Sequence, residues 1–278
     1  MSAPRLPVAF QGELGAFSQE AARRLCGPDV AVLPCTRFED IFRSVKDGIA
    51  SGAIVPIENT LAGSVHENYD HLVNFELPIV AETSVRIVHN LIAPKGVRFS
   101  QIKRAFSHPV ALNQCLDFFA RNPEIEKIPF YDTAGSVKMV REMGDKTVAA
   151  VASRRAADLF GMQILAELIQ DNPENLTRFL VISTQPGEPG PDAKTSIVFS
   201  LKNLPGSLFK AMSVFALRDI DLTKIESRPL AGKAFEYFFY IDFAGSILDP
   251  VVAKALAHLE EYAIFLRVFG SYPRHRYS

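Results

Sequence analysis

The sequence has none of the long apolar runs, leader peptides or cysteine frameworks that are typical of membrane and secreted proteins. No apolar stretch approaches the ~20 residues that a helix needs to span a bilayer. Residues 1–7 are polar and form neither a signal peptide nor a transit segment. The three cysteines, Cys26, Cys35 and Cys115, are odd in number and have no metal-ligand spacing. This usage favours reduced thiols, so we expect a cytoplasmic protein that does not contact a membrane.

The chain also lacks an excess of charge of either sign. Its 30 Lys and Arg residues and 31 Asp and Glu residues give a formal net charge of -1. No basic run alternates with aromatic residues, so no nucleic-acid partner is predicted. With 48% hydrophobic and 22% charged residues among 278, the composition is that of a globular protein long enough for two domains.

Motifs for bound cofactors are missing too. Gly12 and Gly15 do not have the spacing of a dinucleotide-binding loop, and the chain has neither a Walker loop nor a G-x-S-x-G nucleophile elbow. His66 and His71 come close to the zinc motif H-E-x-x-H but stand five positions apart. On a helix this spacing separates the side chains by roughly 140°, so they cannot share a metal ion. The sequence therefore predicts no metal and no cofactor.

A segment rich in Gly and Pro, residues 185–193, divides the chain. Five of its nine residues are Gly or Pro, which excludes a helix or a central strand and predicts a linker. Before it, extended apolar segments alternate with segments of helical periodicity. We expect strands at 8–10, 30–33, 53–57, 103–106, 127–131, 147–152 and 180–182, and helices at 36–49, 109–119 and 133–143. This alternation predicts α/β architecture with largely parallel sheets in two small lobes.

Two of these helices have recognisable beginnings. Thr36 and Glu39 have the spacing of a capping box, and an apolar stripe from Phe38 to Ile49 follows them. Pro109 suits the first turn of the second helix, because its missing N–H costs nothing there. That helix is expected to continue through one apolar stripe, formed by Leu112, Cys115, Leu116 and Phe119.

The segment after the linker follows a different pattern, in which strands and helices come in the order βαββαβ. Ile197, Phe199 and Leu201 alternate along its first strand, and Pro205-Gly206 ends it. The expected elements are a strand at 195–202, a helix at 208–215, strands at 221–229 and 235–243 joined by a turn at Ala231, Gly232 and Lys233, a helix at 250–262 and a strand at 265–269. This order predicts a ferredoxin-like unit.

Four clusters of polar residues lie beside apolar elements before the linker. They are Glu58, Asn59 and Thr60; Ser107, His108 and Pro109, with Gln114; Asp132, Thr133 and Ser136; and Asn175, Thr177, Arg178 and Phe179. Strand ends and helix starts face the ligand crevice of α/β folds, and their free N–H groups favour an anion. Arg178 suits a carboxylate. Caps, turns or a structural salt bridge account for each cluster about as well, but together they predict a site for a small polyanionic metabolite.

At these clusters the sequence resembles the prephenate dehydratase family, over nearly the whole chain. The motifs are AFQGELGAFSQEAA, VPIENTLAGSVHENYDHL, SHPVALNQC, YDTAGS, VASRRAADLFGMQIL and NLTRF, in that order. From Lys194 onward, NLPGSLF and KIESRPL resemble an ACT regulatory domain, and FEYFFYIDF and FLRVFGSYP resemble plant-type arogenate dehydratases and their bacterial relatives. Val110 departs from the glutamine often found there, which puts a secondary contact in doubt.

The resemblance implies a fold, an assembly and an activity. The fold would be a two-lobed, periplasmic-binding-protein-like α/β catalytic domain at 5–184, the linker at 185–193, and a ferredoxin-like ACT domain at 194–273. The assembly would be a homotetramer built as a dimer of dimers. The activity would be the cofactor-free conversion of prephenate to phenylpyruvate in L-phenylalanine biosynthesis, with loss of carbon dioxide and water. L-phenylalanine would act as the allosteric effector.

The resemblance also implies roles for individual residues. Thr177 matches the catalytic threonine, and Glu58 matches a position that supports the site. The expected substrate-binding residues are Asn59, Thr60, Ser107, Gln114, Thr133, Arg178 and Phe179. The expected effector-binding residues are Gly206, Ser207, Leu208, Glu226, Ser227, Arg228 and Pro229.

A mechanism follows from these roles as a hypothesis. Expulsion of the ring hydroxyl limits the reaction, so Thr177 is expected to donate a hydrogen bond to that oxygen. Arg178 and the helix N-termini are expected to hold the side-chain carboxylate of the substrate more firmly than the ring carboxylate, which must leave as carbon dioxide.

Several alternatives stay open at this point. An arogenate dehydratase would produce phenylalanine directly, and no single residue decides between the keto group of prephenate and the ammonium group of arogenate. A non-catalytic amino-acid sensor would have the same regulatory segment but no need for the NLTRF motif. A structural oligomerisation protein would leave the polar clusters unexplained. The sign of the phenylalanine effect and any effect of tyrosine are equally undecided.

Overall fold

The computed structural model describes residues 6–230, 232–233 and 235–276. These form two compact units, one from the described residues of 1–65 and 83–179 and the other from those of 66–82 and 180–278. The predicted domain boundaries (5–184, 185–193 and 194–273) stay a prediction, and residue 5 and Ala231 of the predicted turn lie outside the described residues. In the described part of the chain, no helix combines the length and the apolar character that crossing a bilayer requires.

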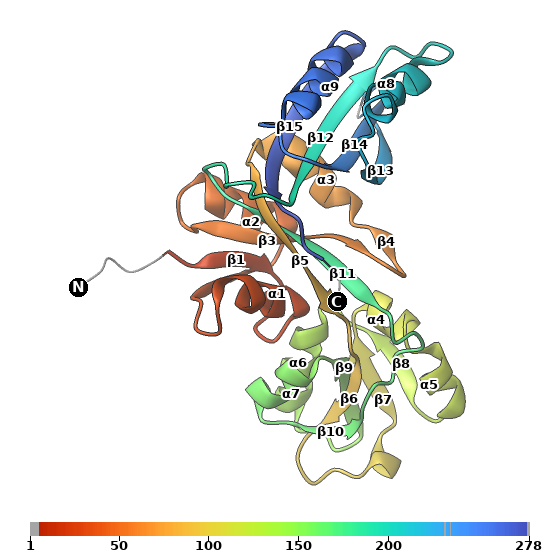
Figure 1. Ribbon diagram of the computed structural model, residues 1–278. Helices are drawn as coiled ribbons and strands as arrows, with labels where there is room; N and C mark the ends of the chain where they lie inside the picture. Colours follow the sequence, from red (N-terminus) through yellow and green to blue (C-terminus); the bar gives the residue numbers. More distant parts are fainter. Residues whose placement is uncertain (1–5, 231, 234, 277–278) are drawn as a thin grey trace, which may run out of the picture. The chain divides into compact units, whose positions relative to one another are not determined.

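The first sheet carries the N-terminal half of the first unit (Figure 1). Its strand order is β2-β1-β3-β11-β5, and the short β4 pairs with β3. The strands are β1 (Val8–Gln11), β2 (Val32–Cys35), β3 (Gly52–Asn59), β4 (Gly63–Ser64), β5 (Ile79–Arg86) and β11 (Leu176–Ile182), and the helices are α1 (Phe17–Cys26) and α2 (Phe38–Lys46). Phe10, Phe42 and Ile54 are fully buried in its core. Because β11 pairs with β3 in this sheet, residues near 176 lie beside β3 although they are far apart in the sequence.

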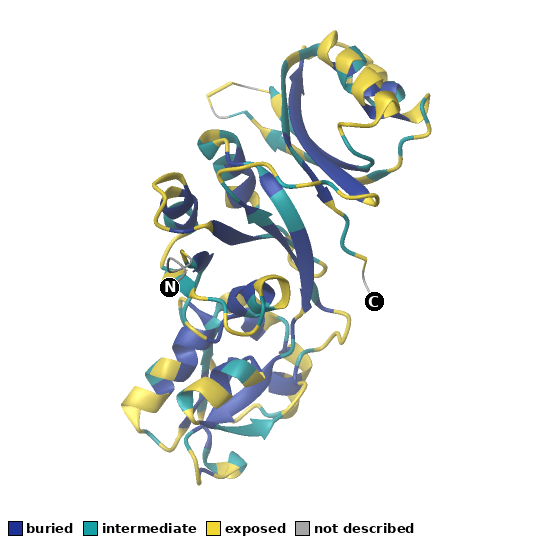
Figure 2. Ribbon diagram, turned by 60° about the vertical axis from the view of Figure 1, so that its left-hand side comes forward, coloured by how far each residue is buried: buried dark blue, intermediate teal, exposed yellow. Residues whose placement is uncertain are grey.

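The second sheet completes the first unit. Its strand order is β10-β6-β9-β7-β8. The strands are β6 (Asn90–Ala93), β7 (Arg104–Ser107), β8 (Glu126–Pro129), β9 (Val148–Ala152) and β10 (Gln163–Ala166), and the helices are α4 (Pro109–Asn113), α5 (Leu116–Arg121), α6 (Thr133–Met143), α7 (Arg154–Phe160) and a 3-10 turn at Phe99–Gln101. All five residues of the central strand β9 are buried, whereas β10 is half-buried and β8 is largely exposed. The helices of this part carry exposed faces, drawn in yellow in Figure 2.

The second unit contains the predicted βαββαβ order. Its elements are α3 (His66–Phe75), β12 (Ala193–Leu201), α8 (Ser207–Ala216), β13 (Leu222–Pro229), β14 (Tyr237–Ala244), α9 (Pro250–Glu260) and β15 (Ala263–Pro273). The four strands lie in the order β13-β14-β12-β15, and each pair is antiparallel. Ile197, Phe199 and Leu201 on β12 share one core with Ala211 and Phe215 on α8. The two-lobed α/β fold with a ferredoxin-like unit is thus confirmed.

Local chemistry explains the elements that were predicted well. Helix α6 has the predicted bounds because the Asp132 side chain caps it, accepting the N–H of Gly135 at 2.6 Å, and Gly144 ends it in the left-handed region. Gly206, with a φ of 80°, precedes α8. A side chain at this position would be strained, which explains the glycine.

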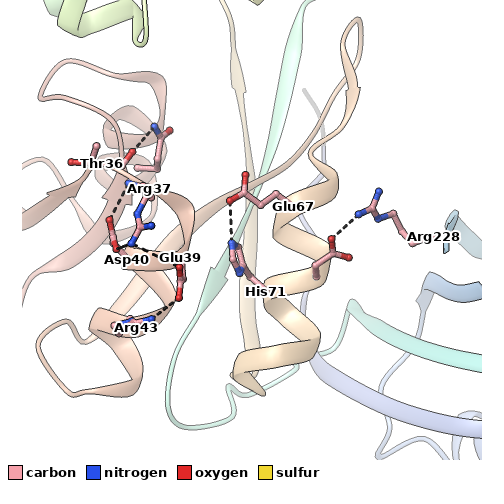
Figure 3. Close-up of polar contacts among 10 residues, drawn as sticks. Thr36, Arg37, Glu39, Asp40, Arg43, Glu67, His71 and Arg228 are labelled. Atoms are coloured by element: carbon pink, nitrogen blue, oxygen red, sulfur yellow. Dashed lines mark hydrogen bonds and ion pairs between the residues drawn. The ribbon is translucent and has the colours of Figure 1, made fainter. Parts of the chain in front are cut away.

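The predicted capping box of α2 lies one residue too early. Strand β2 pairs with β1 as far as Cys35, two residues beyond the predicted strand. The cap is instead formed at Arg37, whose N–H donates to the Asp40 carboxylate at 3.2 Å (Figure 3). The helix ends at Lys46, which leaves Ile49 outside the apolar stripe and 56% exposed.

The single helix predicted from Pro109 to Phe119 is also wrong, because the structure has two short helices with a break between them. The carboxylate of Asp171 accepts the N–H groups of Leu116 and Asp117 at 2.9 and 3.0 Å. In return the N–H of Asp171 donates to the carbonyl of Gln114 at 2.8 Å. A residue more than fifty positions away thus supplies the bonds that a continuous helix would have made.

The prediction of largely parallel sheets holds only in part. β1 is parallel to β2 and β3, and β7 is parallel to β8 and β9. However, β6 is antiparallel to β9, and β10 is antiparallel to β6. Apolar runs predict burial on both faces, but they do not fix strand direction.

Candidate active site

A cavity of about 470 Å³ lies in the first unit. Its walls come from β3 and β11 of the first sheet, from α1, and from α4 and α6 beside the second sheet. Much of the lining is apolar, with Phe17, Phe38 and Phe179 among its aromatic members. The polar side chains of the lining come from several different elements, which is how small-molecule sites fix the orientation of a ligand.

Three side-chain amides form a closed ring of hydrogen bonds at this cavity. Asn59 Nδ2 donates to Asn175 Oδ1 at 2.6 Å, Asn175 Nδ2 donates to Gln114 Oε1 at 2.9 Å, and Gln114 Nε2 lies 3.3 Å from Asn59 Oδ1. The direction of the ring is fixed by backbone groups. Asn59 Oδ1 accepts the N–H groups of Leu61 and Ala62 at 3.0 and 2.8 Å, so its nitrogen must face β11.

The Thr177 hydroxyl completes this arrangement. Asn59 Nδ2 donates to Thr177 Oγ1 at 2.9 Å, so the hydroxyl oxygen acts as an acceptor toward the amide. Its own hydrogen is then available for a donor bond to another group. Thr177 and Phe179 line the cavity from the same face of β11, since alternate residues of a strand share a face.

His89 is a member of the cavity lining that was not predicted. It is 1% exposed, and its Nε2 lies 3.0 Å from Gln114 Oε1. Burial lowers the pKa of His89 below its ordinary value, and the bond with Gln114 opposes that effect in part. The imidazole is therefore expected to be neutral at pH 7.

Three helix N-termini reach the cavity. Residues Ala16, Phe17 and Ser18 at the start of α1 line it, as does Thr133 at the start of α6. The N–H groups and the dipole of a helix N-terminus favour a negative group, and at α6 the Asp132 carboxylate already fills that role. The sequence predicted the starts of α4 and α6, and both line the cavity, α4 through His108, Val110 and Ala111. Helix α4 has only five residues, however, and His108 caps its first turn, with Nδ1 accepting the N–H of Val110 at 3.2 Å. The start of α1 was not predicted.

Asp132 is the acidic side chain of the cavity, and it is 8% exposed. Burial raises the pKa of Asp132 above its usual range, and the hydrogen bond from the Gly135 N–H opposes this rise. Gly12 approaches so closely that a Cβ there would meet Asp132 Oδ2 at 2.9 Å. No Lys or Arg belongs to the lining formed by the described residues.

Comparison with known proteins decides the family. The family model for prephenate dehydratase matches residues 8–187. The chain belongs to the prephenate dehydratase family. Arogenate dehydratase/prephenate dehydratase 2, a chloroplastic protein of Arabidopsis thaliana, is 45% identical over 280 residues, which cover 97% of this chain and 73% of that protein. The resemblance predicted from the motifs is thus confirmed.

Two solved structures are similar over nearly the whole chain. The prephenate dehydratase of Arthrobacter aurescens, solved in complex with L-Phe, is 34% identical, with a TM-score of 0.89 and coverage of 97% of this chain and 90% of that one. A protein described as GqqA, a quorum-quenching acylase, is 35% identical, with a TM-score of 0.89 and coverage of 96% and 98%. Since one fold occurs under two described activities, the chemistry has to be argued from the site.

In this member of the prephenate dehydratase family, several of the predicted site residues come together. Asn59, Gln114, Thr133, Thr177 and Phe179 line the cavity. They come from β3, the α4–α5 break, the start of α6 and β11. Asn175 was named in a polar cluster but given no role, and it is fully buried at the centre of the amide ring.

Arg178 does not reach the cavity, which corrects its predicted contact with the substrate. It lies on the face of β11 opposite to Thr177, is 5% exposed, and its Nη1 is 3.2 Å from Glu58 Oε1. Glu58 is likewise outside the lining. The pair links β3 to β11 behind the site, so both residues support it from outside.

Two further predictions of substrate contact are corrected in the same way. Ser107 is fully buried, and its hydroxyl donates to the Val151 carbonyl at 2.6 Å. The Thr60 hydroxyl donates to the Glu174 carbonyl at 3.1 Å and accepts the Leu176 N–H at 3.0 Å. Neither lines the cavity, because each side chain satisfies backbone groups of a neighbouring strand or loop.

His89 has almost no recognisable signal in the sequence. It stands just before the apolar strand β6, a position that reads as a helix or strand boundary and carries no motif. Its backbone is bound by residues that are distant in the sequence. The His89 N–H donates to Gln170 Oε1 at 3.0 Å, and the His89 carbonyl accepts the Ile169 N–H at 2.9 Å.

The predicted effector residues fall into two groups within the second unit. Ser207 and Leu208, at the start of α8, line a small cavity of about 110 Å³. Glu226, Ser227, Arg228 and Pro229 lie on β13, the edge strand of the sheet. Residues of β13 do not line that small cavity, so the two groups do not form one pocket among the described residues of a single chain.

Alternate residues of β13 point toward helix α3, which belongs to the same unit. Glu226 Oε1 lies 3.3 Å from His66 Nε2, and Arg228 Nη2 donates to Asp70 Oδ2 at 2.6 Å. Figure 3 shows Arg228 directed at α3 and the separate contact between Glu67 and His71 along that helix. The second predicted effector motif is therefore engaged with α3.

Proposed function

We propose that this cavity catalyses the decarboxylative dehydration of prephenate to phenylpyruvate, the step that leads to L-phenylalanine. The substrate ring loses its carboxylate as carbon dioxide and its hydroxyl as water, and one proton is taken up. The ring becomes aromatic, which drives the reaction forward. The observation that supports this proposal above all is the 2.9 Å bond from Asn59 Nδ2 to Thr177 Oγ1 at the cavity wall.

That bond determines what Thr177 can do. Because its oxygen accepts from Asn59, its hydrogen is directed to another acceptor, and the departing ring hydroxyl is the acceptor that the reaction supplies. A positioned donor of this kind contributes roughly 10²- to 10⁴-fold to a rate. Thr177 acts by orientation, since a free threonine hydroxyl is far too weak an acid to give up its proton.

The rest of the cavity suits the two carboxylates of the substrate. The N-terminus of α1, which no side chain caps, offers N–H groups to the side-chain carboxylate. The ring carboxylate has to lose its charge, and no Lys or Arg in the described lining stabilises it in the ground state. Phe17, Phe38 and Phe179 provide apolar surroundings in which neutral carbon dioxide is favoured over a carboxylate.

The test is turnover of prephenate by the purified chain and two variants at one position. Phenylpyruvate is followed by its ultraviolet absorbance in alkali. Thr177→Ser keeps the hydroxyl and should retain much of kcat, whereas Thr177→Ala should lose at least about a hundredfold. A Thr177→Ala variant with normal kcat would refute the role of Thr177. A wild-type chain that leaves both prephenate and arogenate unchanged would refute the proposed activity and favour an amino-acid sensor.

A second candidate, arogenate dehydratase activity, is supported by one specific observation. The described cavity lining carries an acidic group, Asp132, and no Lys or Arg. Arogenate has an ammonium group where prephenate has a keto oxygen, and a carboxylate would bind the ammonium and repel the keto oxygen. A side-by-side comparison of kcat/KM for the two substrates separates the candidates.

We also propose that L-phenylalanine regulates the activity through the C-terminal βαββαβ unit, acting as an ACT domain. A relative of known structure was solved in complex with L-Phe. Because Ser207 and Leu208 lie apart from the β13 group in one chain, a complete site would need the edge of a second copy, within a tetramer built from dimers. Saturating phenylalanine should change both the activity and Tm. If neither changes, this part of the proposal is wrong.

A further inference from the structure

His89 stands out among the groups at the cavity because its role is not explained by the amide ring alone. It is 1% exposed, and its ring meets Phe17 edge-on, with centroids 5.8 Å apart. Its Nε2 contacts Gln114, but its Nδ1 is buried and has no hydrogen-bond partner among the described residues. A buried polar group in that state is unusual and calls for a reason.

The hydrogen-bond network dictates which nitrogen of His89 carries the hydrogen. Backbone N–H groups fix Asn59 Oδ1, so Gln114 must present its nitrogen to that oxygen. Gln114 Oε1 therefore faces both Asn175 Nδ2 and His89 Nε2, at 2.9 and 3.0 Å. An oxygen needs a donor opposite it, so Nε2 must bear the hydrogen and Nδ1 must be bare.

We infer that His89 is a positioning residue, which donates from Nε2 to Gln114 and thereby holds the amide ring in the one direction that leaves the Thr177 hydrogen free. The inference rests on the proposed dehydratase activity. If Gln114 turned over, its oxygen would face Asn59 Oδ1 and its nitrogen would face Asn175 Nδ2, two repulsive pairs. The His89 donor opposes that reversal, and Asn59 remains oriented toward Thr177 Oγ1 at 2.9 Å.

The backbone places His89 and Gln114 as one unit for this task. Segment 169–171 holds both of them: Ile169 N–H donates to the His89 carbonyl at 2.9 Å, and Asp171 N–H donates to the Gln114 carbonyl at 2.8 Å. Gln170 Oε1 accepts the His89 N–H at 3.0 Å. Protonation of His89 would put an N–H at Nδ1 with no acceptor for it among the described residues, so the neutral ring is the favoured form.

A matched pair of variants tests the inference. Gln at position 89 places a donor close to the position of Nε2, whereas Asn places its polar atoms near Nδ1 and cannot reach Gln114. Both lose the aromatic contact with Phe17, so the difference between them reports on the Nε2 donor. We expect His89→Gln to keep kcat within about threefold of wild type, and His89→Asn to lose about tenfold or more with a smaller change in KM.

The pH profile and Tm of both variants complete this experiment. An unaltered pH profile in His89→Gln is expected, because the role requires no titration. If His89→Asn is as active as wild type, or if His89→Gln loses as much kcat as His89→Asn at equal Tm, the inference is overturned. Loss of one limb of the pH profile in His89→Gln would show an acid or base role and would also overturn it.

A spectroscopic measurement keeps the inference testable if the variants do not fold. In ¹⁵N NMR of the wild-type protein with labelled histidine, the His89 ring should show a protonated Nε2 and a bare Nδ1 at neutral pH, without ligand. The Nδ1–H tautomer or a charged ring would overturn the inference. This measurement does not depend on turnover. A chain without dehydratase activity would refute the proposed function, whereas the tautomer of His89 would still be measured independently.

Discussion

The guanidinium of Arg228 donates to the carboxylate of Asp70 at 2.6 Å, and this contact joins strand β13 to helix α3. Helix α3 begins at His66, directly after Val65, and Val65 lines the candidate active site. The chain therefore passes from the cavity lining at Val65 directly into α3, the helix that Arg228 contacts. A ligand that engages Arg228 would have to share or break this contact, which gives it a physical route to the site.

Asp70→Asn should weaken the response to phenylalanine and leave activity without phenylalanine unchanged. The substitution removes the charge that pairs with Arg228 but keeps the shape of the side chain. The side chains of Arg228 and Asp70 are 22% and 48% exposed, so the pair contributes less than about 1 kcal/mol. We expect a change of about two- to fivefold in the phenylalanine concentration that gives half of the effect, measured by activity.

The matched control for that variant is Glu67→Gln on the same helix. Glu67 pairs with His71 within α3, at 3.3 Å, and makes no contact with β13 among the contacts described (Figure 3). Its phenylalanine response should equal that of wild type. An identical shift in both variants would mean that α3 responds to any loss of charge, and the specific role of the contact between Asp70 and Arg228 would be wrong.

Asn59→Asp should reverse the hydrogen bond at the Thr177 hydroxyl. A carboxylate cannot donate to Thr177 Oγ1, so the Thr177 hydrogen would turn toward position 59 and away from the substrate. We expect kcat to fall by about a hundredfold or more, with a much smaller change in KM. Steady-state kinetics with prephenate measure this, and a large increase in KM at normal kcat would contradict the assignment.

Arg178→Ala should reduce stability more than it affects KM. The sequence alone suggested a carboxylate-binding arginine, but the side chain is 5% exposed and paired with Glu58 at 3.2 Å. Loss of the guanidinium removes this buried charge-assisted bond between β11 and β3, at a cost of about 2 kcal/mol or more, which should lower Tm by several degrees. Glu58→Gln should cost less, because its amide oxygen can still accept from Arg178. A normal Tm with a strongly raised KM for Arg178→Ala would restore the original role.

Asp132→Asn should lower kcat/KM for arogenate while sparing prephenate. Asparagine caps a helix as well as aspartate does, so α6 should remain intact. The loss should reach about tenfold if the carboxylate binds the ammonium group. Equal effects on both substrates, or none on either, would exclude Asp132 as the group that recognises arogenate.

The same carboxylate predicts a pH dependence. Burial raises the pKa of Asp132, so it is protonated at a higher pH than an ordinary aspartate, whose pKa is about 3.9. The ammonium group requires the ionised form, so kcat/KM for arogenate should fall on acidification before that for prephenate does, and Asp132→Asn should abolish this difference. Identical acid limbs for the two substrates in the wild-type chain would argue against it.

Periodicity and local capping were sufficient for much of the fold. The bounds of α6, the βαββαβ order, and the helix start at Pro109 follow from interactions within a few residues, such as the bond from the Gly135 N–H to Asp132. The motifs around Asn59, Gln114 and Thr177 likewise indicated the family and three residues of the cavity. Such features depend on neighbouring residues, and the sequence states them directly.

Tertiary structure alone decided which side chains the cavity contains. The bonds from Asp171 end α4 at Gln114, whose side chain lines the cavity. The alternation of β11 directs Thr177 toward the cavity and Arg178 toward Glu58. The hydrogen bonds of His89 and Asn175 in the amide ring could not be predicted, because their partners Gln114 and Asn59 are distant in the sequence. Spacing along a chain encodes local periodicity, whereas partners more than fifty residues apart are chosen by how elements pack and satisfy each other's buried polar groups.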